Sequence, residues 1–265
     1  MVQVQAITDP DDPRIAAYRD VRERDLVGRR GQFVAEGEVV LRVLARSSLT
    51  EPVSVLLAEK RVAGLADALD RLAPEVPVYA AGQAVMDAIV GFPIHRGILA
   101  LGRRRETPSA GELLASLPRG RATVLVLNGI ANHDNMGGLF RNAAAFGADA
   151  VLVDADCCDP LYRKAIRVSV GASLLVPFAR LERGEDVVDA LGGAGFEPLA
   201  LSPRGETPLA ALERPERAAV LLGAEGPGLS PAVMSRCRTV SIPMAAGFDS
   251  LNVAVTGGIV LHALG

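Results

Sequence analysis

Residues 218–264 decide the fold, and they read AAVLLGAEGPGLSPAVMSRCRTVSIPMAAGFDSLNVAVTGGIVLHAL. The apolar run 219–222 has the length of a buried strand. The loop after it, residues 223–228, contains three glycines, a proline and the carboxylate of Glu225. Glycine is needed where the backbone takes a positive φ or approaches another group closely. This composition predicts a loop that approaches a ligand rather than a plain turn.

A second loop of the same stretch extends from Ile242-Pro243-Met244 to Ser250-Leu251-Asn252, where an apolar helix over 251–264 begins. The hydroxyl of Ser250 is expected to cap this helix by accepting from its first free N–H groups. A Gly-rich turn followed by an ordinary capped helix is the alternative, and neither loop alone decides between the two interpretations.

Upstream, short apolar runs alternate with helical patterns from residue 121 onward. Residues 123–127 form a continuous apolar run that is typical of a buried parallel strand. Further strands are expected at 150–153, 174–177, 196–201, 219–222 and 239–242. Helices are expected at 139–146, 162–170, 186–192 and 251–264. The pattern predicts an open parallel α/β sheet, in which ligands bind beyond the carboxyl ends of the strands. Loops 128–138, 223–228 and 242–252 would all lie at that edge.

The N-terminal part predicts a separate, smaller α/β domain. A helix is expected over 14–26, and alternating strands and helices follow as far as residue 101. We therefore expect a domain over 1–105, a linker over 106–120 and a second domain over 121–265.

The composition indicates an ordinary globular protein, since 49% of the 265 residues are hydrophobic and 22% are charged. No apolar run has the length of a membrane span, and the N-terminus does not resemble a signal peptide. Three cysteines and three scattered histidines predict neither a disulfide framework nor a metal site. These features favour a cytoplasmic protein with no metal and no membrane partner.

Arginines cluster in the N-terminal part although the net charge is −3. The cluster includes Arg22, Arg24, Arg29 and Arg30. A guanidinium matches phosphate geometry, so this cluster is a candidate RNA-binding surface. A solvated helix face with interspersed carboxylates is the alternative, and the charges alone favour it.

The chain contains three motifs in order. The first is N-x-x-N-x-G-x-x-x-R-x-A at 132–143, the second is G-x-E-x-x-G-L at 223–229, and the third is I-P-M-x-x-x-x-x-S-L-N at 242–252. Together they resemble the SpoU (TrmH) branch of the SPOUT RNA methyltransferases. The resemblance covers residues 125–265. Residues 1–105 resemble, more loosely, the substrate-binding domain that often precedes this fold.

The resemblance implies a parallel-sheet SPOUT domain that ends in a deep trefoil knot, preceded by a small RNA-binding domain. It also implies a homodimer through the knot domain and transfer of a methyl group from S-adenosylmethionine (AdoMet) to a ribose 2′-hydroxyl of rRNA or tRNA. By position, the residues expected at the cofactor are Leu201, Ser202, Gly223, Ile242, Met244 and Leu251.

The motifs assign five residues to catalysis: Asn135, Arg141, Glu225, Ser250 and Asn252. Arg141 matches the family's catalytic arginine. Because a guanidinium does not readily give up its proton, we expect Arg141 to grip a phosphate and to stabilise negative charge. Glu225 is expected either to anchor its loop or to pair with Arg141.

Two other functions fit the same fold. One is an RNA-binding or ribosome-assembly protein that lacks the chemistry, and the retention of all five motif residues argues against it. The other is an enzyme that methylates a base rather than a ribose. Analysis of the methylated nucleoside separates the two reactions.

Overall fold

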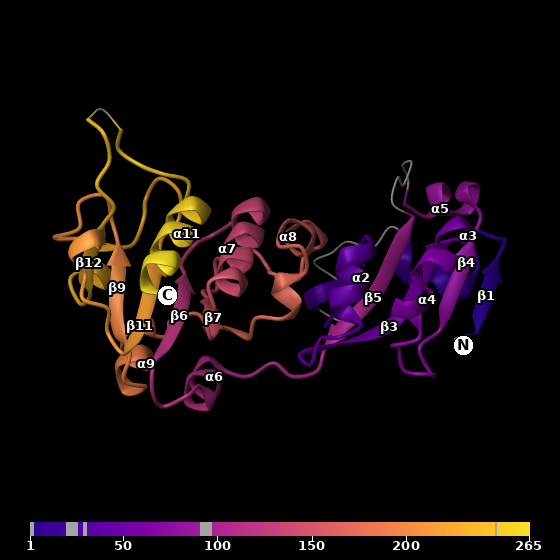
Figure 1. The fold of residues 1–265 in the computed structure, drawn as a ribbon, viewed down its shortest axis with the longest axis horizontal. Coiled ribbons are helices and arrows are strands. Elements are labelled where there is room, and N and C mark those ends of the chain that lie inside the picture. Colours follow the sequence, from indigo (N-terminus) through magenta and orange to yellow (C-terminus); the bar gives the residue numbers. More distant parts are fainter. Residues whose placement is uncertain (1–2, 20–25, 29–30, 91–96, 247) are drawn as a thin grey trace. The chain divides into compact units, whose positions relative to one another are not determined.

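A computed structural model describes residues 3–19, 26–28, 31–90, 97–246 and 248–265. The chain divides into two compact units, each with its own sheet (Figure 1). The N-terminal unit comprises Met1–Glu106 and Leu161–Leu175, and the C-terminal unit comprises Thr107–Pro160 and Val176–Gly265. Among the described residues, no helix is both long and apolar enough to cross a lipid bilayer.

The sheet of the N-terminal unit has five strands in the order β1-β4-β3-β5-β2. Their bounds are β1 Val4–Ile7, β2 Gln32–Glu36, β3 Thr50–Ala58, β4 Val78–Ala81 and β5 Ile98–Arg104. The helices are η1 Pro13–Tyr18, α2 Glu38–Leu44, α3 Glu59–Val62, η2 Ala63–Leu65, α4 Ala66–Leu69 and α5 Gln83–Val90. Strands β1, β4 and β3 are parallel, whereas β5 is antiparallel to β3 and to β2.

The expectation of one continuous α-helix over 14–26 is wrong, although residues 26–28 are helical. The structure has a 3₁₀ helix over Pro13–Tyr18, and Arg19 already has extended backbone angles. Asp12 caps this helix by accepting from the Arg14 N–H at 2.9 Å. Ile15 and Tyr18 of this helix are both buried. The predicted RNA-binding residues Arg22, Arg24, Arg29 and Arg30 lie outside the described residues.

The segment Leu161–Leu175 packs on the N-terminal unit although it lies between two strands of the other sheet in sequence. It contains α8 Arg163–Val168 and η3 Ala172–Leu174. The buried carboxylate of Glu36 pairs with Arg163 at 3.1 Å and lies 3.7 Å from Arg167. The Ser47 hydroxyl donates to the Leu174 carbonyl at 2.6 Å. An ion pair and a hydrogen bond therefore hold this segment in place.

The C-terminal unit contains a seven-stranded parallel sheet in the order β10-β12-β9-β11-β6-β7-β8. Its strands are β6 Ala122–Leu127, β7 Ala150–Val153, β8 Phe178–Arg180, β9 Glu197–Leu201, β10 Thr207–Pro208, β11 Arg217–Leu222 and β12 Arg238–Ser241. Its helices are α6 Ala110–Ser116, α7 His133–Ala145, α9 Val187–Gly193, η4 Leu209–Ala211, α10 Pro231–Met234 and α11 Val253–Leu264. The parallel α/β sheet predicted for this part of the chain is confirmed.

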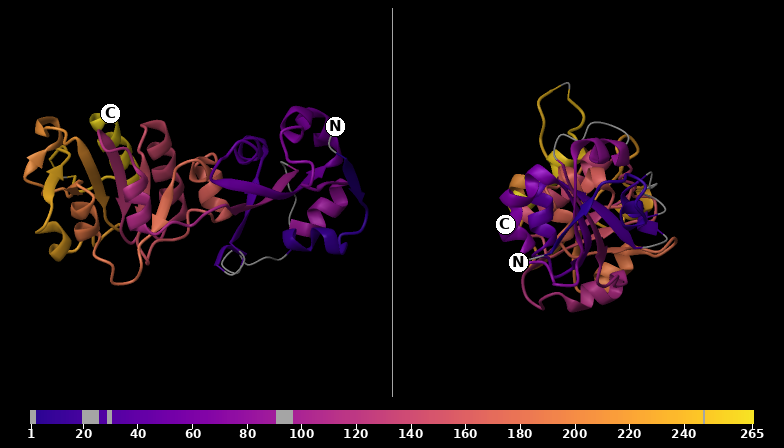
Figure 2. Two further views of the ribbon diagram at one scale, coloured as in Figure 1. Left: turned by 90° about the horizontal axis from the view of Figure 1, so that it is seen from below. Right: turned by 90° about the vertical axis from the view of Figure 1, so that its right-hand side faces the viewer.

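Helices cover both faces of this sheet (Figure 2). Side chains alternate between the faces of a strand, so Val124 and Val126 pack in one core cluster with α6 and α9. Leu125, between them, faces the side of α7 and α11. Every residue of β6 is buried, as the continuous apolar run predicts.

The strand expected at 174–177 is wrong. Residues 172–174 form η3 instead, and the strand β8 begins at Phe178. Gly171 has φ +84°, a left-handed conformation that favours glycine, and it directly precedes η3. Pro177 has no N–H to donate to the ladder, and only its carbonyl takes part, accepting from Val151 at 2.9 Å.

Close packing between α7 and α11 positions the site described below. A Cβ on Gly138 would lie 2.9 Å from the Ala254 Cβ, and one on Gly257 would lie 2.6 Å from Leu139 Cδ2. The Asn142 amide also donates to the Ala254 carbonyl at 2.6 Å. Because Gly138 and Gly257 have no side chains, the two helices approach closely. This brings the first turn of α11 beside the first turn of α7.

Candidate active site

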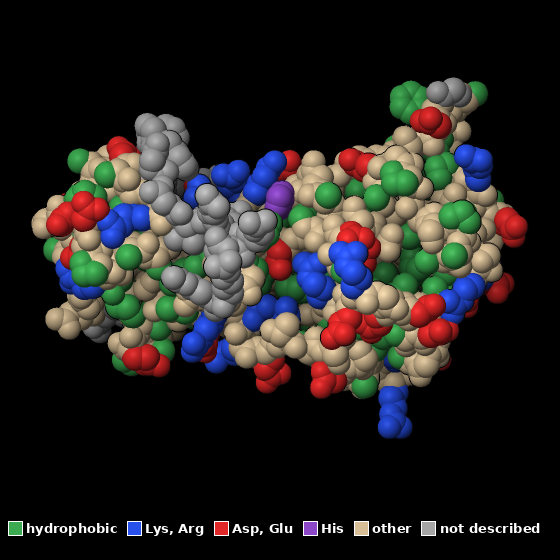
Figure 3. Space-filling view, turned by 180° about the vertical axis from the view of Figure 1, so that it is seen from behind, with side chains coloured by type: hydrophobic (Ala, Val, Ile, Leu, Met, Phe, Trp, Pro, Cys, Tyr) green, Lys and Arg blue, Asp and Glu red, His purple; other side chains and the backbone are tan. Residues whose placement is uncertain are grey.

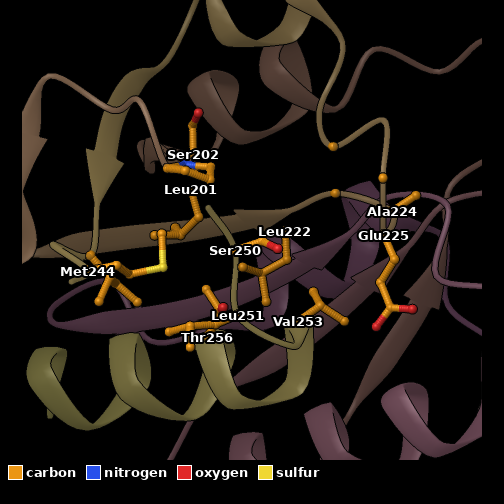
Figure 4. A pocket seen from close by; sticks show the side chains of 15 residues that line it. Leu201, Ser202, Leu222, Ala224, Glu225, Met244, Ser250, Leu251, Val253 and Thr256 are labelled. Carbon is orange, nitrogen blue, oxygen red and sulfur yellow. The ribbon is translucent and has the colours of Figure 1, made fainter. Parts of the chain in front are cut away.

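A pocket of about 170 Å³ lies beyond the carboxyl ends of β9, β11 and β12 (Figure 4). This is the edge of a parallel sheet at which ligands bind. The lining residues are Leu201, Ser202, Pro203, Leu222, Gly223, Ala224, Glu225, Gly226, Gly228, Ile242, Met244, Ser250, Leu251, Val253 and Thr256. Most of these side chains are apolar, and Glu225 is the one charged side chain among the described lining residues.

All six residues expected at a cofactor line this one pocket. The motifs missed three further apolar lining residues and one hydroxyl: Pro203, Leu222, Val253 and Thr256. Thr256 could have been predicted from the sequence, because it follows Asn252 by four residues and therefore lies on the same face of α11. Its hydroxyl donates to the Asn252 carbonyl at 3.2 Å.

The loop 223–228 folds back on itself beside the pocket. The Gly228 N–H donates to the Ala224 carbonyl at 3.0 Å. A Cβ on Gly223 would lie 2.3 Å from the Gly228 carbonyl carbon and 2.4 Å from the Leu229 nitrogen. Only glycine fits at 223, and the close approach expected from the sequence is between two parts of the loop's own backbone.

Three of the predicted catalytic residues form one hydrogen-bonded network. The Asn135 amide donates to Glu225 Oε1 at 2.6 Å, and the Asn252 amide donates to Asn135 Oδ1 at 2.8 Å. Asn252 also donates to the same Glu225 oxygen at 3.3 Å. Asn135 is buried. The network joins α7, the loop 223–228 and the start of α11, so it fixes the loop against both helices.

Glu225 stands at the border between this network and the pocket. In Figure 4 its carboxylate points away from the apolar side chains of Leu201, Met244 and Leu251. Of the two roles considered for Glu225, anchoring of the loop agrees with these contacts, although the donors are side-chain amides. No ion pair between Glu225 and Arg141 occurs within the described parts of the chain.

The cap of α11 is Asn252, and the expectation that Ser250 fills this position is wrong. The Asn252 side-chain oxygen accepts from the Ala254 and Val255 N–H groups at 2.9 and 3.2 Å. The helix begins at Val253, two residues later than expected, so Ser250 is too far away to cap it. The Ser250 hydroxyl instead lies at the pocket and donates to Asp249 at 3.3 Å.

Asn252→Ala should therefore lower the free energy of unfolding by about 2 kcal/mol, because it removes a cap and two side-chain hydrogen bonds. Ser250→Ala is the matched control and should change it by less than about 0.5 kcal/mol. Urea unfolding of the two variants measures both values. A larger loss for Ser250→Ala would contradict the capping described above.

Arg141 lies apart from the network. Its side chain is exposed on α7 and borders a shallow surface hollow lined also by Phe146, Val255 and Ile259. It does not line the pocket at the strand ends. The five predicted catalytic residues thus divide into the network of three, Ser250 at the pocket, and Arg141 on an open surface.

Cys157 supports the loop after β6. Its sulfur accepts from the Ile130 N–H at 3.2 Å, and its thiol donates to the Leu127 carbonyl at 3.3 Å. Burial raises the pKa of this thiol to about 12. The thiol is therefore protonated at neutral pH and does not act as a nucleophile. No group of side chains suited to a metal ion occurs among the residues that the structure describes.

Residues 122–262 match the SpoU rRNA Methylase family. A relative from Mycobacterium bovis, described as an uncharacterised tRNA/rRNA methyltransferase, is 40% identical over 98% of this chain and 91% of its own length.

Two solved structures resemble this chain along nearly its whole length. An AdoMet-bound rRNA methyltransferase from Sinorhizobium meliloti has a TM-score of 0.82 at 22% identity, over 98% of this chain and 97% of that one. An RNA 2′-O ribose methyltransferase has a TM-score of 0.76 at 25% identity, over 98% of both chains. The matched residues include every motif that forms the pocket and the network, and the chain belongs to the SpoU rRNA methylase family.

Proposed function

We propose that the protein transfers a methyl group from AdoMet to a ribose 2′-hydroxyl of RNA, with rRNA favoured over tRNA. The observation that carries the proposal is the placement of the Asn135–Glu225–Asn252 network at the border of the strand-end pocket. The similar RNA 2′-O ribose methyltransferase supports the ribose as the acceptor.

The chemistry of the pocket suits AdoMet. Apolar side chains from Leu201, Ile242 and Leu251 offer a surface for an adenine ring, and the glycine loop offers backbone groups. When bound, AdoMet supplies an electrophilic methyl group on a positively charged sulfur. Glu225 provides negative charge at the border of the pocket, which favours a cation there.

Arg141 is proposed to act on the RNA. Its exposed guanidinium is free to form two parallel hydrogen bonds with the phosphate of the target nucleotide, which would align the 2′-hydroxyl with the pocket. It would also stabilise the negative charge that develops on the attacking oxygen. Because a guanidinium stays protonated, the hydroxyl proton passes to a phosphate oxygen or to water.

The network is proposed to position the loops rather than to exchange protons. Asn135 and Asn252 hold one Glu225 oxygen between two helices, so loop 223–228 keeps its form when substrate binds. Ser250 lies on the other loop of the pocket, where its hydroxyl is proposed to contact the substrate.

We also propose that the C-terminal unit is knotted and forms a homodimer through α7 and α11. Three exposed apolar side chains lie on this face: Phe146, Val255 and Ile259, with exposed fractions of 38, 51 and 39%. Arg141 borders the same hollow, so a second subunit on this face would complete the surroundings of the arginine.

Val255→Asp should weaken dimerisation roughly 100-fold or more, because each subunit would bury an unpaired carboxylate in the interface. Val39→Asp on α2 is the matched control, since Val39 is 55% exposed and lies in the other unit. Sedimentation equilibrium measures both association constants. A Val255→Asp protein that associates as tightly as the wild type would place the interface elsewhere.

The N-terminal unit is proposed to bind RNA. Basic and acidic side chains are interspersed over the face seen in Figure 3, so binding there would need a local cluster rather than a uniformly basic surface. Arg22, Arg24, Arg29 and Arg30 form such a basic cluster in the sequence.

Replacing these four arginines with glutamine should weaken RNA binding and should make the slope of log K against log salt shallower by roughly 0.7 to 0.9 for each lost phosphate contact. Filter binding at several salt concentrations measures this slope. An unchanged slope would assign the cluster to a solvated surface.

The experiment that tests the function is transfer of labelled methyl from AdoMet to separate pools of rRNA and tRNA, taken from cells that lack the protein. We expect label in the rRNA pool, recovered after digestion as a 2′-O-methyl nucleoside. Label recovered on a base would show that the enzyme methylates a base and not a ribose. RNA binding with no transfer and no AdoMet binding would leave only an RNA-binding protein.

A further inference from the structure

Phe248 stands out among the apolar side chains of the described chain. It is 73% exposed, the largest exposed fraction among the large hydrophobic residues that the structure describes. Apart from Phe146, which contacts His262 edge-on at 5.5 Å, the other described Phe and Tyr rings are buried or half-buried. The ring of Phe248 therefore adds little to the stability of the fold.

Phe248 lies in a segment of the chain that also contributes residues to the pocket. It belongs to the segment between β12 and α11, which rises away from the sheet in Figure 1. Met244 and Ser250 of the same segment line the pocket. Two residues of extended chain span at most about 7 Å, so the backbone of Phe248 lies within that distance of the backbone of Ser250. The Phe248 N–H donates to the Ala245 carbonyl at 3.1 Å, so the backbone turns at this point between the two pocket-lining residues.

We propose that Phe248 stacks on an unpaired base of the RNA that presents its ribose to the pocket. This inference rests on the proposed function and adds a residue that positions the substrate. A ribose hydroxyl can approach a pocket closely only if its nucleotide is accessible, and accessible bases in RNA are commonly held by aromatic side chains. A phenyl ring accepts any base, because every base has a π face.

The neighbours of Phe248 favour RNA over a second protein chain. Ala245, Ala246, Asp249 and Ser250 surround it in sequence with small or polar side chains, whereas the core of a protein interface is a contiguous apolar patch. The apolar face of α7 and α11 supplies such a patch on other elements. The carboxylate of Asp249 disfavours contact with a phosphate, so the ring is expected to meet the face of a base.

Methyl transfer by full-length variants tests the proposal. Phe248→Ala and Phe248→Leu should each lower kcat/KM for rRNA roughly 10- to 100-fold, because both lack an aromatic face. Phe248→Trp should retain activity. The AdoMet dissociation constant and the melting temperature should stay at their wild-type values in all three. Wild-type activity in Phe248→Leu would overturn the inference while leaving the proposed function intact.

A fluorescence experiment gives a second readout that does not need turnover. The chain contains no tryptophan, so Phe248→Trp carries a single reporter. A single-stranded RNA oligonucleotide of mixed sequence should quench its emission, and Val39→Trp on α2 serves as the control for non-specific quenching.

Three results would overturn the inference: no quenching by RNA, a change in emission that depends on protein concentration without RNA, or a change in emission caused by AdoMet alone. The second would assign the ring to the dimer interface and the third to the cofactor. Absence of methyl transfer by the wild type would instead contradict the proposed function.

Discussion

Arg141→Ala should lower kcat for methyl transfer roughly 100- to 1,000-fold, the range seen when a group that stabilises developing charge is removed. The AdoMet dissociation constant should change less than about twofold, because Arg141 does not line the pocket. Stability should also be unchanged, since the side chain is exposed. Single-turnover kinetics with isothermal titration of AdoMet separates the two quantities.

Arg183→Ala is a suitable control for this experiment. Arg183 pairs with Asp156 on the surface, and its side chain is 77% exposed, so its loss should affect neither quantity. A large loss of AdoMet affinity in Arg141→Ala would show that the arginine acts at the cofactor and not at the phosphate. Lysine at position 141 should restore only part of the rate, because an ammonium cannot form two parallel hydrogen bonds with a phosphate.

Gly223→Ala should weaken AdoMet binding roughly 10- to 100-fold, which corresponds to about 1–3 kcal/mol of overpacking. The new methyl group would meet the Gly228 backbone at 2.3 Å, where ordinary contacts begin at 3.4 Å. Backbone atoms cannot turn aside as the end of a side chain can, so the loop itself must shift. Because that loop lines the pocket, its displacement alters the cofactor site directly.

Gly192→Ala is the matched control for Gly223→Ala. Gly192 lies in α9, and a Cβ there meets no heavy atom within 4 Å. Alanine in a helix is more favourable than glycine, so this variant should be as stable as the wild type or slightly more so, with unchanged AdoMet affinity. Thermal melts and cofactor titrations of both variants test the comparison. Wild-type affinity in Gly223→Ala would show that the loop can relax without cost to the site.

Much of the C-terminal fold was predictable, because its strands are buried on both faces and read as continuous apolar runs. Residues 122–127 are an example, and the loops that follow such strands could be placed at the ligand-binding edge from the sequence alone. The six pocket residues came from the family resemblance, four of them within the motifs and Leu201 and Ser202 by position, rather than from periodicity. Periodicity does not show which backbone segments converge on one pocket.

The errors have identifiable physical causes. Ser250 was chosen as the cap because it directly precedes the apolar run that begins at Leu251. The helix begins two residues later, and its first free N–H groups, those of Ala254 and Val255, donate to the side chain of Asn252. The strand β1 was missed because it is short and half-exposed, and because its one neighbour among the described strands is β4, far away in sequence. The Asn135–Glu225 bond joins residues 90 apart, and no local pattern predicts such a contact.

The position of Leu161–Leu175 limits how this protein can be divided. The family match begins at residue 122, which suggests a catalytic module that could be cut away from the preceding residues. Such a cut would separate Glu36 from Arg163 and leave a buried carboxylate without its counter-charge in one fragment. In the other fragment, the connection from β7 to β8 would lose the surface on which it packs. The N-terminal unit is therefore built from two separate stretches of the chain. To exchange N-terminal domains between relatives, residues 161–175 would have to be exchanged together with residues 1–106.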